Sequence, residues 1–459
     1  MQADLELFQK LSKKLIAHEE KTGVVKPIKA EKLLNILDLD VSNNGLKREE
    51  LESLLEEVVL STPRTSTKLF FNQLFGGRNN KGTLGELLAV MLNNSMYTYK
   101  VGGPQVGIEK VIISKVCQML NFGKNADGTF PPGGSMSNFM AMLMARDAYD
   151  RDIKFNGVSE KMIIYTSSAS HYSITKNAMF GGIGINQIRK IEVDQFGKMI
   201  PEALQNQIET DLKAGLKPFF VNATAGTTVL GSFDDINKIH NVTKNYRGLW
   251  LHVDGAYCGS VIFSKSYKHL VDGVEKADSF SFNAHKMLNV PLSCSIIITK
   301  EKHNLKHSFA CEADYLYQTD GDEYNLGKTS LQCGRRNDAL KFWTLWKSVG
   351  TEGLERMVDR QFQLAETARN YVNNHPDYEL YSYGDSISIC FNYKNVDPKD
   401  LCNSLYEDGK LMVGYGEFQG KIFVRLVTIN SNNEADDILN FFKVLEAYVE
   451  EKESELVTI

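Results

Sequence analysis

Residues 249–259 read LWLHVDGAYCG, and this stretch decides the fold class. An apolar run of strand length ends there on one acidic residue, Asp254, and a turn containing glycine follows. A carboxylate at the end of so apolar a strand is costly unless it has a partner. Taken alone, Asp254 is equally well explained as the cap of the next turn.

Further short apolar runs lie on both sides of this stretch. They read KMIIYTS at 161–167, KPFFVNAT at 217–224 and CSIIIT at 294–299, and stretches with a helical pattern and Gly-rich turns separate them. Strand-like runs that alternate with helical segments predict a largely parallel α/β sheet. In such sheets the functional residues gather at the strand ends.

The two ends of the chain have other patterns. Residues 1–60 predict amphipathic helices that are too thin to form a core of their own. Residues 350–374 predict one long helix, and a short alternation of strands and helices follows. We therefore expect an N-terminal helical arm (1–60), a large α/β domain (61–347) and a small C-terminal α+β domain (348–459).

The composition excludes several classes of function. The 459 residues are 42% hydrophobic and 24% charged, which is typical of a globular protein. The net charge is −5, and Lys and Arg are scattered along the chain, which argues against a nucleic-acid partner. The sequence contains no run of 18 apolar residues, so it predicts no membrane helix. The seven cysteines contain no CxxC pair, so neither disulfides nor zinc are expected, and the cytoplasm is the expected location.

We expect no metal site. The segment DLDVSNNGLKREELE (38–52) has the spacing of a calcium loop at its start, but its twelfth position is Leu51 when the loop begins at Asp40. A polar turn between two helices explains the segment better.

The segment PPGGSMSN (131–138) predicts a binding site for an anion. Gly134 lets backbone amides approach a ligand, Ser135 adds a hydroxyl, and a helical pattern follows. The N-terminus of a helix favours negative charge, so the segment fits a phosphate group. An ordinary loop is the alternative for this segment alone.

Two more segments place suitable groups after predicted strands. His171 in SSASHYSITKNA follows the run at 161–167, where an imidazole could lie over a flat ring, and Thr224 ends the run at 217–224. A structural histidine and a simple turn are the alternatives.

The segment ADSFSFNAHKML (277–288) follows a strand-like run with Asn283, His285 and Lys286. A lysine amine has a pKa of about 10.4, so keeping it neutral at pH 7 costs roughly 4 to 5 kcal/mol. Covalent attachment to a cofactor aldehyde removes this difficulty. A histidine–lysine pair taken alone is more often a surface feature.

Together these segments resemble the group II pyridoxal-phosphate decarboxylases, in the branch that acts on glutamate, cysteine sulfinate and aspartate. The matching motifs, in the family's order, are FFNQL, TYK, PPGGSMSN, SHYS, NATAGTT, HVDGAY, SFNAHK, LQCGRR, KFWTLWK and MVGYG. The resemblance covers about residues 69–427. It implies a fold type I architecture with a mainly parallel seven-stranded sheet, pyridoxal 5'-phosphate as cofactor, and a homodimer with its active sites at the interface.

The resemblance also implies roles for single residues. Lys286 is similar to the lysine that holds the cofactor, Asp254 to the acid that keeps the ring nitrogen protonated, and His171 to the imidazole stacked on the ring. The positions similar to the remaining cofactor contacts are Gly134, Ser135, Thr224, Ala256, Ser279, Asn283 and His285. Arg425 matches the arginine that binds the substrate α-carboxylate, for which a bidentate guanidinium is well suited.

The segment CEADYLYQTDGDEYNLGK (311–328) corresponds to the family's mobile loop. Its Tyr324 is the candidate acid that returns a proton to the substrate in the partner subunit's site. Tyr315 and Tyr317 are expected to be packing residues.

The substrate is less well specified. Phe75 in FFNQLF and Ser95 and Tyr97 in SMYTY favour aspartate or cysteine sulfinate, giving β-alanine or hypotaurine, over glutamate, giving 4-aminobutyrate. Two positions depart from the family: Ala284 stands for proline, which is expected to be tolerated, and Lys100 stands for glutamate, which puts the side-chain specificity in doubt. The rival hypotheses are another reaction on the same cofactor and a non-catalytic interaction protein with this fold.

Overall fold

The computed structural model describes residues 2–21, 23–311 and 322–457, and these residues form two compact units. Unit 1 comprises Met1–Gly77, Leu364–Tyr381 and Ser388–Ile459, and unit 2 comprises Arg78–Gln363 and Ser382–Ile387. The three-domain division expected from the sequence stays a prediction. No helix in the described ranges is long and apolar enough to cross a membrane.

A seven-stranded sheet forms the centre of the described part of unit 2. Its strands stand in the order β1-β7-β6-β5-β4-β2-β3, and the pairs β6–β7 and β7–β1 are antiparallel while the other neighbours are parallel. The strands are β1 (Asp127–Thr129), β2 (Met162–Ser167), β3 (Ile188–Ile191), β4 (Lys217–Thr224), β5 (Trp250–Gly255), β6 (Ser279–Asn283) and β7 (Ser295–Thr299). The mainly parallel seven-stranded sheet expected from the sequence is confirmed.

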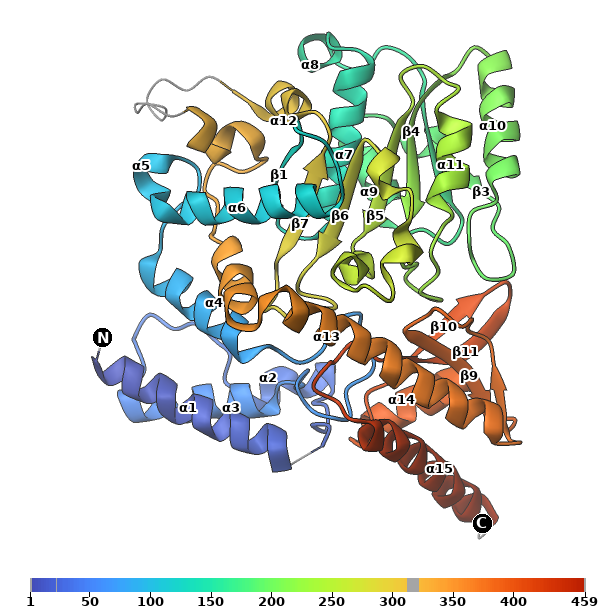
Figure 1. Cartoon of the computed structure of the whole chain (residues 1–459). Coiled ribbons are helices and arrows are strands. Elements are labelled where there is room, and N and C mark those ends of the chain that lie inside the picture. Colours follow the sequence, from blue (N-terminus) through green and yellow to red (C-terminus); the bar gives the residue numbers. More distant parts are fainter. Residues whose placement is uncertain (1, 22, 312–321, 458–459) are drawn as a thin grey trace. The chain divides into compact units, whose positions relative to one another are not determined.

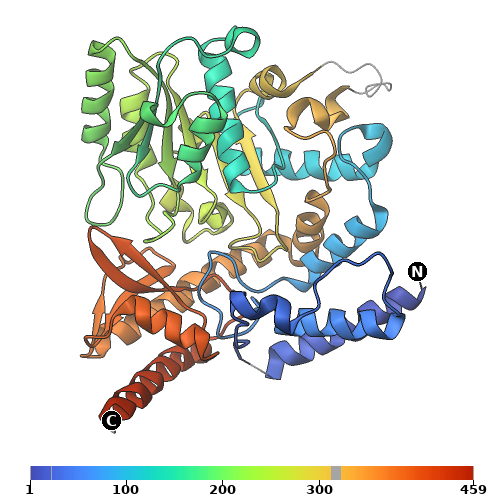
Figure 2. The same cartoon turned by 180° about the vertical axis from the view of Figure 1, so that it is seen from behind.

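Helices cover both faces of this sheet, as the opposite views in Figures 1 and 2 show. The helices of unit 2 are α4 (Asn80–Leu92), α5 (Tyr99–Gly102), α6 (Pro104–Met119), α7 (Gly134–Tyr149), α8 (Ile153–Asn156), α9 (Ser173–Phe180), α10 (Pro201–Lys213), α11 (Ile236–Thr243) and α12 (Lys302–Phe309). Short 3-10 turns join them: η2 (Ile185–Gln187), η3 (Gly259–Phe263), η4 (Lys268–Val271), η5 (Val274–Lys276), η6 (Asp322–Tyr324) and η7 (Leu326–Thr329). Strands β2, β4, β5, β6 and β7 are buried along almost their whole length, which explains their apolar sequences.

Helix α7 is central to the site because it packs on β4, β5, β6 and β7. Its Met140 and Met144 are buried in a core cluster with Ile164 of β2 and Phe220 of β4. This packing fixes the N-terminus of α7 beside the carboxyl ends of the parallel strands.

The long helix α13 (Ala339–Asn374) contributes residues to both units and is interrupted at Gly350, where φ is 69° and ψ is 176°. The single helix predicted from residue 350 onward forms its second part.

Unit 1 contains an antiparallel four-stranded sheet in the order β10-β11-β9-β8. Its strands are β8 (Tyr378–Leu380), β9 (Ser388–Tyr393), β10 (Gly414–Phe418) and β11 (Lys421–Val427). Its helical elements are α1 (Gln2–Lys21), η1 (Ala30–Lys32), α2 (Leu33–Ile36), α3 (Arg48–Ser61), α14 (Pro398–Glu407) and α15 (Ala435–Val457). Helices α1 and α3 pack together, and an ion pair of 2.5 Å joins Lys14 to Glu56.

Candidate active site

A cavity of about 210 Å³ lies in unit 2 at the carboxyl ends of β4, β5 and β6 and the N-terminus of α7. Its lining residues are Gly134, Ser135, Asn138, His171, Tyr172, Thr224, Gly226, Thr228, Asp254, Ala256, Tyr257, Asn283, His285 and Lys286. The structure thus brings together every cofactor contact expected from the sequence except Ser279. Parallel strands deliver their last residues to one edge of a sheet, so segments more than 100 residues apart meet here.

One end of the cavity has the geometry of an anion site. Gly133 precedes α7 with φ at 110°, a conformation that favours glycine. A Cβ added to Gly134 would lie 2.9 Å from both Ala256 Cβ and Asn283 Nδ2, so only glycine leaves this approach open. Ser135 is fixed because its carbonyl accepts a hydrogen bond of 2.9 Å from Asn177 Nδ2.

Two buried polar atoms in the cavity have no hydrogen-bond partner among the described residues, namely Thr224 Oγ1 and Asn283 Oδ1. Buried polar groups are almost always satisfied in folded proteins, so these two atoms indicate that a polar ligand belongs in the cavity. A phosphorylated, ring-shaped cofactor fits this arrangement, with its anion at the α7 N-terminus and its ring farther along the strand ends.

Lys286 reaches the cavity from the turn after β6, where its backbone N–H donates to Asn283 O over 3.1 Å. The described residues offer its Nζ no hydrogen bond, and its Nζ lies 5.9 Å from the centroid of the Tyr257 ring. Burial lowers the pKa of Lys286, and the nearby Asp254 carboxylate partly opposes this shift. A lysine with this environment suits covalent chemistry with an aldehyde.

Asp254 is the second-last residue of β5 and is held on both of its oxygens. Its Oδ1 accepts from Ala256 N over 2.9 Å, and its Oδ2 accepts from Asn138 Nδ2 over 2.7 Å. The side chain is only 4% exposed, so these donors offset much of the cost of burying a carboxylate.

His171 follows β2, and its Nδ1 accepts a hydrogen bond of 3.1 Å from Ser173 N. Burial lowers the pKa of His171, so the ring is neutral near pH 7 with its proton on Nε2. Its neighbour in the sequence, Tyr172, packs against it with ring centroids 4.3 Å apart.

His285 is buried, and its Nδ1 lies 2.9 Å from both the backbone N and O of Cys294. Burial lowers the pKa of His285 to about 3. The imidazole is therefore neutral at the cavity wall. The backbone of Cys294, the residue before β7, fixes its position.

Asn138, the last residue of PPGGSMSN, was not assigned a role from the sequence but lines the cavity. It donates to Asp254 from the cavity wall. Because Asn138 lies four residues after Gly134 on α7, the two residues share one face of the helix. The helical period was thus the signal that could have identified it.

Ser279 is not brought to the cavity. It is the first residue of β6, whereas Asn283 is the last, and four residues of strand span roughly 13 Å. Its hydroxyl lies 2.9 Å from Trp250 Nε1 and 2.9 Å from His252 Nδ1. We therefore leave Ser279 out of the proposed phosphate contacts.

The predicted substrate-binding residues lie on different units. Ser95 and Tyr97 stand in unit 2 before α5, where Tyr97 O accepts from Gly327 N over 2.8 Å. Phe75 and Arg425 belong to unit 1. Arg425 Nη2 on β11 donates to Asn72 O over 3.1 Å, and the centroid of the Phe75 ring lies 6.4 Å from that of the Phe70 ring. The roles of all four residues stay predictions.

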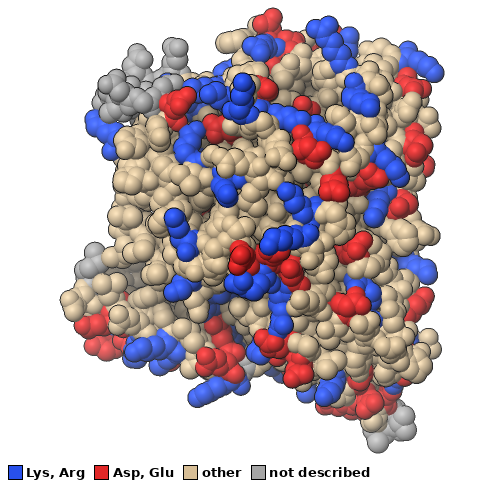
Figure 3. Space-filling model, viewed as in Figure 1, with Lys and Arg blue, Asp and Glu red and all other residues tan. Residues whose placement is uncertain are grey.

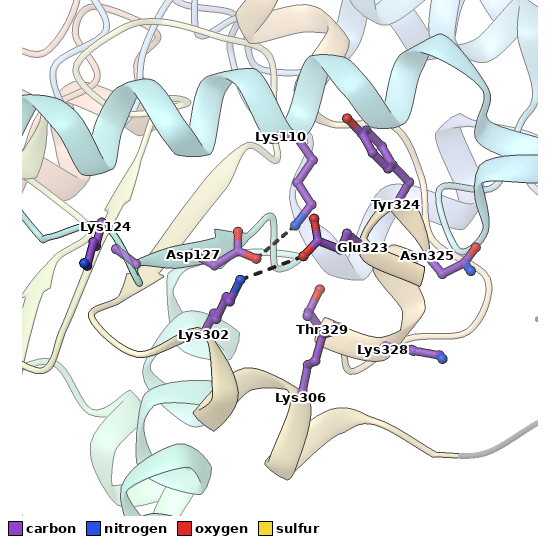
Figure 4. Close-up of a pocket in the computed structure, with 11 residues that line it drawn as sticks. Lys110, Lys124, Asp127, Lys302, Lys306, Glu323, Tyr324, Asn325, Lys328 and Thr329 are labelled. Carbon is purple, nitrogen blue, oxygen red and sulfur yellow. Dashed lines mark hydrogen bonds and ion pairs between the residues drawn. The ribbon is translucent and has the colours of Figure 1, made fainter. Parts of the chain in front are cut away.

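Tyr324 lies in η6, and its side chain is 45% exposed. Its ring meets the ring of Tyr99 edge to face at 5.5 Å. Tyr324 borders a second cavity of about 210 Å³, shown in Figure 4, and is not among the residues that line the Lys286 cavity of its own chain. Tyr315 and Tyr317 lie outside the described residues.

The second cavity is rich in lysine. Its side chains come from α6, β1, α12 and the turns around Tyr324: Lys110, Lys124, Asp127, Lys302, Lys306, Glu323, Asn325, Lys328 and Thr329. In Figure 4 Lys110 points to Asp127 and Lys302 to Glu323, at 2.9 and 3.8 Å. The Lys302–Glu323 pair joins α12 to the residue that precedes the candidate proton donor, and the Lys110–Asp127 pair joins α6 to β1.

A family model and several known proteins match this chain. The model of the pyridoxal-dependent decarboxylase conserved domain matches residues 30–394. The acidic amino acid decarboxylase GADL1 of Xenopus tropicalis is 36% identical over 433 residues, which cover 89% of this chain and 84% of the relative. The cysteine sulfinic acid decarboxylase of Mus musculus is 38% identical over 367 residues, covering 79% and 74%.

Solved structures show the same similarity. The crystal structure of mouse CSAD superimposes with a TM-score of 0.91 and 32% sequence identity, covering 97% of this chain and 99% of that chain. The crystal structure of Oryza sativa TDC with PLP and tryptamine has a TM-score of 0.90 at 22% identity, and so supports the fold.

Proposed function

Because the chain belongs to the pyridoxal-dependent decarboxylase family, and is a pyridoxal-phosphate-dependent carboxy-lyase of acidic amino acids, we propose that its substrate is aspartate or cysteine sulfinate. The observation that carries the site assignment is the meeting of Lys286, Asp254 and the glycine approach at Gly134 in one cavity. The cofactor supplies an aldehyde that captures amines and a protonated pyridine ring that withdraws electrons from the bond to be broken.

In this proposal Lys286 holds the cofactor and Asp254 faces its ring nitrogen. The two hydrogen bonds to the Asp254 carboxylate keep it in place as an anion, which stabilises positive charge on a facing N–H. The neutral His171 ring would lie against a face of the planar group. Thr224 and Ala256 would lie beside the ring, and Gly134, Ser135, Asn283 and His285, which also line the cavity, would surround the phosphate.

The substrate carboxylate and the final proton need two further groups. We assign the α-carboxylate to Arg425, because a guanidinium can bind it through two parallel hydrogen bonds. We assign the proton to Tyr324, whose hydroxyl would deliver it to Cα in the partner subunit's site. Exposure of the Tyr324 side chain and its absence from the lining of its own chain's Lys286 cavity support that assignment.

The choice among acidic substrates rests on Phe75, Ser95 and Tyr97. A phenyl ring at position 75 and a phenol at position 97 occupy room that a longer side chain needs, which favours aspartate or cysteine sulfinate over glutamate. Both named relatives, an acidic amino acid decarboxylase and a cysteine sulfinic acid decarboxylase, are consistent with this preference.

The proposed homodimer has a suitable surface on α4. This helix exposes an apolar set, Leu84, Leu87, Leu88, Val90, Met91 and Leu92, and the area over α4 and α5 is mostly free of charged side chains in Figure 3. Contiguous exposed apolar surface of this kind marks association sites. A second copy of this chain is the partner that we propose.

We also propose a reducing compartment, the cytoplasm, as the location. All seven cysteines are free, and five of them are buried. Buried thiols without disulfides are typical of proteins from such compartments.

A substrate panel tests the proposed function. The purified protein with added pyridoxal phosphate is given aspartate, cysteine sulfinate or glutamate at one pH, and carbon dioxide and the amine product are measured. Release of carbon dioxide is expected, with aspartate or cysteine sulfinate turned over fastest. Faster turnover of glutamate would contradict the substrate assignment, and an oxo acid in place of carbon dioxide would indicate transamination. No turnover of any amino acid would favour a non-catalytic interaction protein.

A further inference from the structure

A row of buried polar side chains leads along β5 to Asp254. Residues two apart on a strand face the same side, so Trp250, His252 and Asp254 share one face of β5. Ser279 of β6 is the registered neighbour of His252, and Asn138 comes from α7, which packs on both strands. Apart from Trp250, at 7%, none of these side chains is more than 4% exposed.

The hydrogen bonds in this row have a single consistent direction. Asn138 Nδ2 donates to Asp254 Oδ2 over 2.7 Å, which leaves its Oδ1 as an acceptor for His252 Nε2 over 3.0 Å. His252 must therefore carry its proton on Nε2 and accept at Nδ1.

The remaining partners complete the series. The Ser279 hydroxyl lies 2.9 Å from His252 Nδ1 and donates to it. The same oxygen accepts from Trp250 Nε1, also over 2.9 Å. Each donor in the row thus points toward the Asp254 carboxylate.

His252 is neutral throughout the physiological range, because burial lowers its pKa to about 4. The ring of Phe220 on β4 stacks on it with centroids 6.0 Å apart. With Asn138 Oδ1 facing Nε2, the uncharged imidazole satisfies both of its neighbours in the tautomer described above.

We propose that His252 is a positioning residue for the cofactor: through Asn138 it fixes the orientation of the amide that donates to Asp254. An asparagine amide can rotate by half a turn, which would present Oδ1 instead of Nδ2 to the carboxylate. The His252 N–H opposes this rotation by donating to Oδ1, while Nδ2 donates to the carboxylate and, over 3.1 Å, to Ser173 Oγ. The inference rests on the proposed function, in which Asp254 faces the ring nitrogen of pyridoxal phosphate.

If these residues only supported the fold, apolar side chains could fill the same space more simply. Buried polar networks cost stability unless every member is satisfied. This row is satisfied throughout and ends on the one acid that lines the cavity, so the geometry points to a role at the cofactor.

The test measures binding of pyridoxal phosphate to apo protein by titration, together with the visible absorption band of the bound cofactor. His252→Phe removes the N–H but keeps a ring. It should raise the dissociation constant of pyridoxal phosphate about tenfold, as expected for one lost hydrogen bond to a charged group. It should also change the visible absorption band of the bound cofactor. His252→Gln supplies a donor near the same position and should restore both properties.

Tyr165→Phe is the matched control. Tyr165 lies on β2, and its buried hydroxyl donates to Asp211 of α10 over 2.9 Å, away from the row that leads to Asp254. The substitution should lower the melting temperature of the apo protein but keep the cofactor dissociation constant within about twofold.

Several outcomes decide the matter. Wild-type affinity and absorption in His252→Phe, or equal defects in the Phe and Gln variants, would overturn the role of His252. If His252→Phe does not fold, Ser279→Ala replaces it, because this substitution removes the donor to His252 Nδ1. Unchanged affinity of Ser279→Ala for pyridoxal phosphate would then overturn the role of His252. Asp254→Asn runs in parallel: wild-type affinity and absorption in that variant would contradict the proposed role of Asp254 itself.

Discussion

Gly327 lies directly against Tyr97. Its backbone N–H donates to Tyr97 O over 2.8 Å, and a Cβ added to it would clash with the Tyr97 ring. Nearby, Leu326 is buried with Met96 and Val106. The chain that follows Tyr324 is therefore fixed on the segment that contains Ser95 and Tyr97, the residues we assign to substrate choice.

This contact predicts the effect of Gly327→Ala. The added methyl group must displace the Tyr97 ring, so the free energy of unfolding should fall by about 1 to 3 kcal/mol and kcat/KM should fall with it. Urea unfolding and steady-state kinetics measure the two effects. Gly384→Ala, at a position with open space around the Cα, is the control and should change stability by less than about 0.5 kcal/mol. Equal effects of the two substitutions would contradict the packing argument.

Phe75→Ser should change the substrate preference. Removing the phenyl ring enlarges the space that we assign to the substrate side chain, so the ratio of kcat/KM for glutamate to that for aspartate should rise, by about 10-fold or more for a pocket contact of this size. Phe130→Leu, a change at a buried position outside the predicted substrate residues, is the control. An unchanged ratio in Phe75→Ser would remove Phe75 from the substrate site.

Burial of His252 predicts a pH dependence of stability. Its pKa is about 4 in the folded chain and about 6.5 when unfolded, so below pH 6.5 the unfolded chain binds a proton that the folded chain does not. This group therefore lowers stability as the pH falls toward 4. Between pH 7 and pH 5 the wild type should lose about 2 kcal/mol relative to His252→Gln, measured by urea unfolding of both apo proteins. Parallel losses would show that the imidazole is not held neutral.

Asp254→Asn should impair the reaction far more than it impairs the fold. Loss of the negative charge facing the ring nitrogen should lower kcat by about 10²- to 10³-fold. Asp278→Asn is the control. Asp278 is a partly buried acid that accepts a hydrogen bond of 2.8 Å from Leu251 N but does not line the cavity. If both substitutions lowered kcat equally, the decrease would have to be attributed to folding.

The sequence predicted the central strands well because they are buried and apolar. The runs at 217–224 and 294–299 correspond to β4 and β7 almost residue for residue. Strands β1 and β3 were not anticipated. They are short strands at the two edges of the sheet, and a run such as DGT in β1 has no apolar pattern, so its strand conformation depends on pairing with β7.

The cavity was predictable where the residues stand at strand ends, as Thr224, Asp254 and Asn283 do. Ser279 does not line the cavity, and the sequence could not show this because a motif gives order along the chain but not position along a strand. Asn138 and His252 lay within quoted segments, but their roles depend on hydrogen bonds between α7, β5 and β6. Such bonds between distant segments cannot be inferred from spacing alone.

The most direct test concerns Lys286. The protein is saturated with pyridoxal phosphate, reduced with borohydride, digested, and mapped by mass spectrometry. We expect a yellow protein that loses its colour on reduction and one pyridoxyl modification, on the peptide that contains Lys286; Lys286→Ala should carry none. A colourless wild type, or a modification on another lysine, would contradict the assignment of this cavity as the active site.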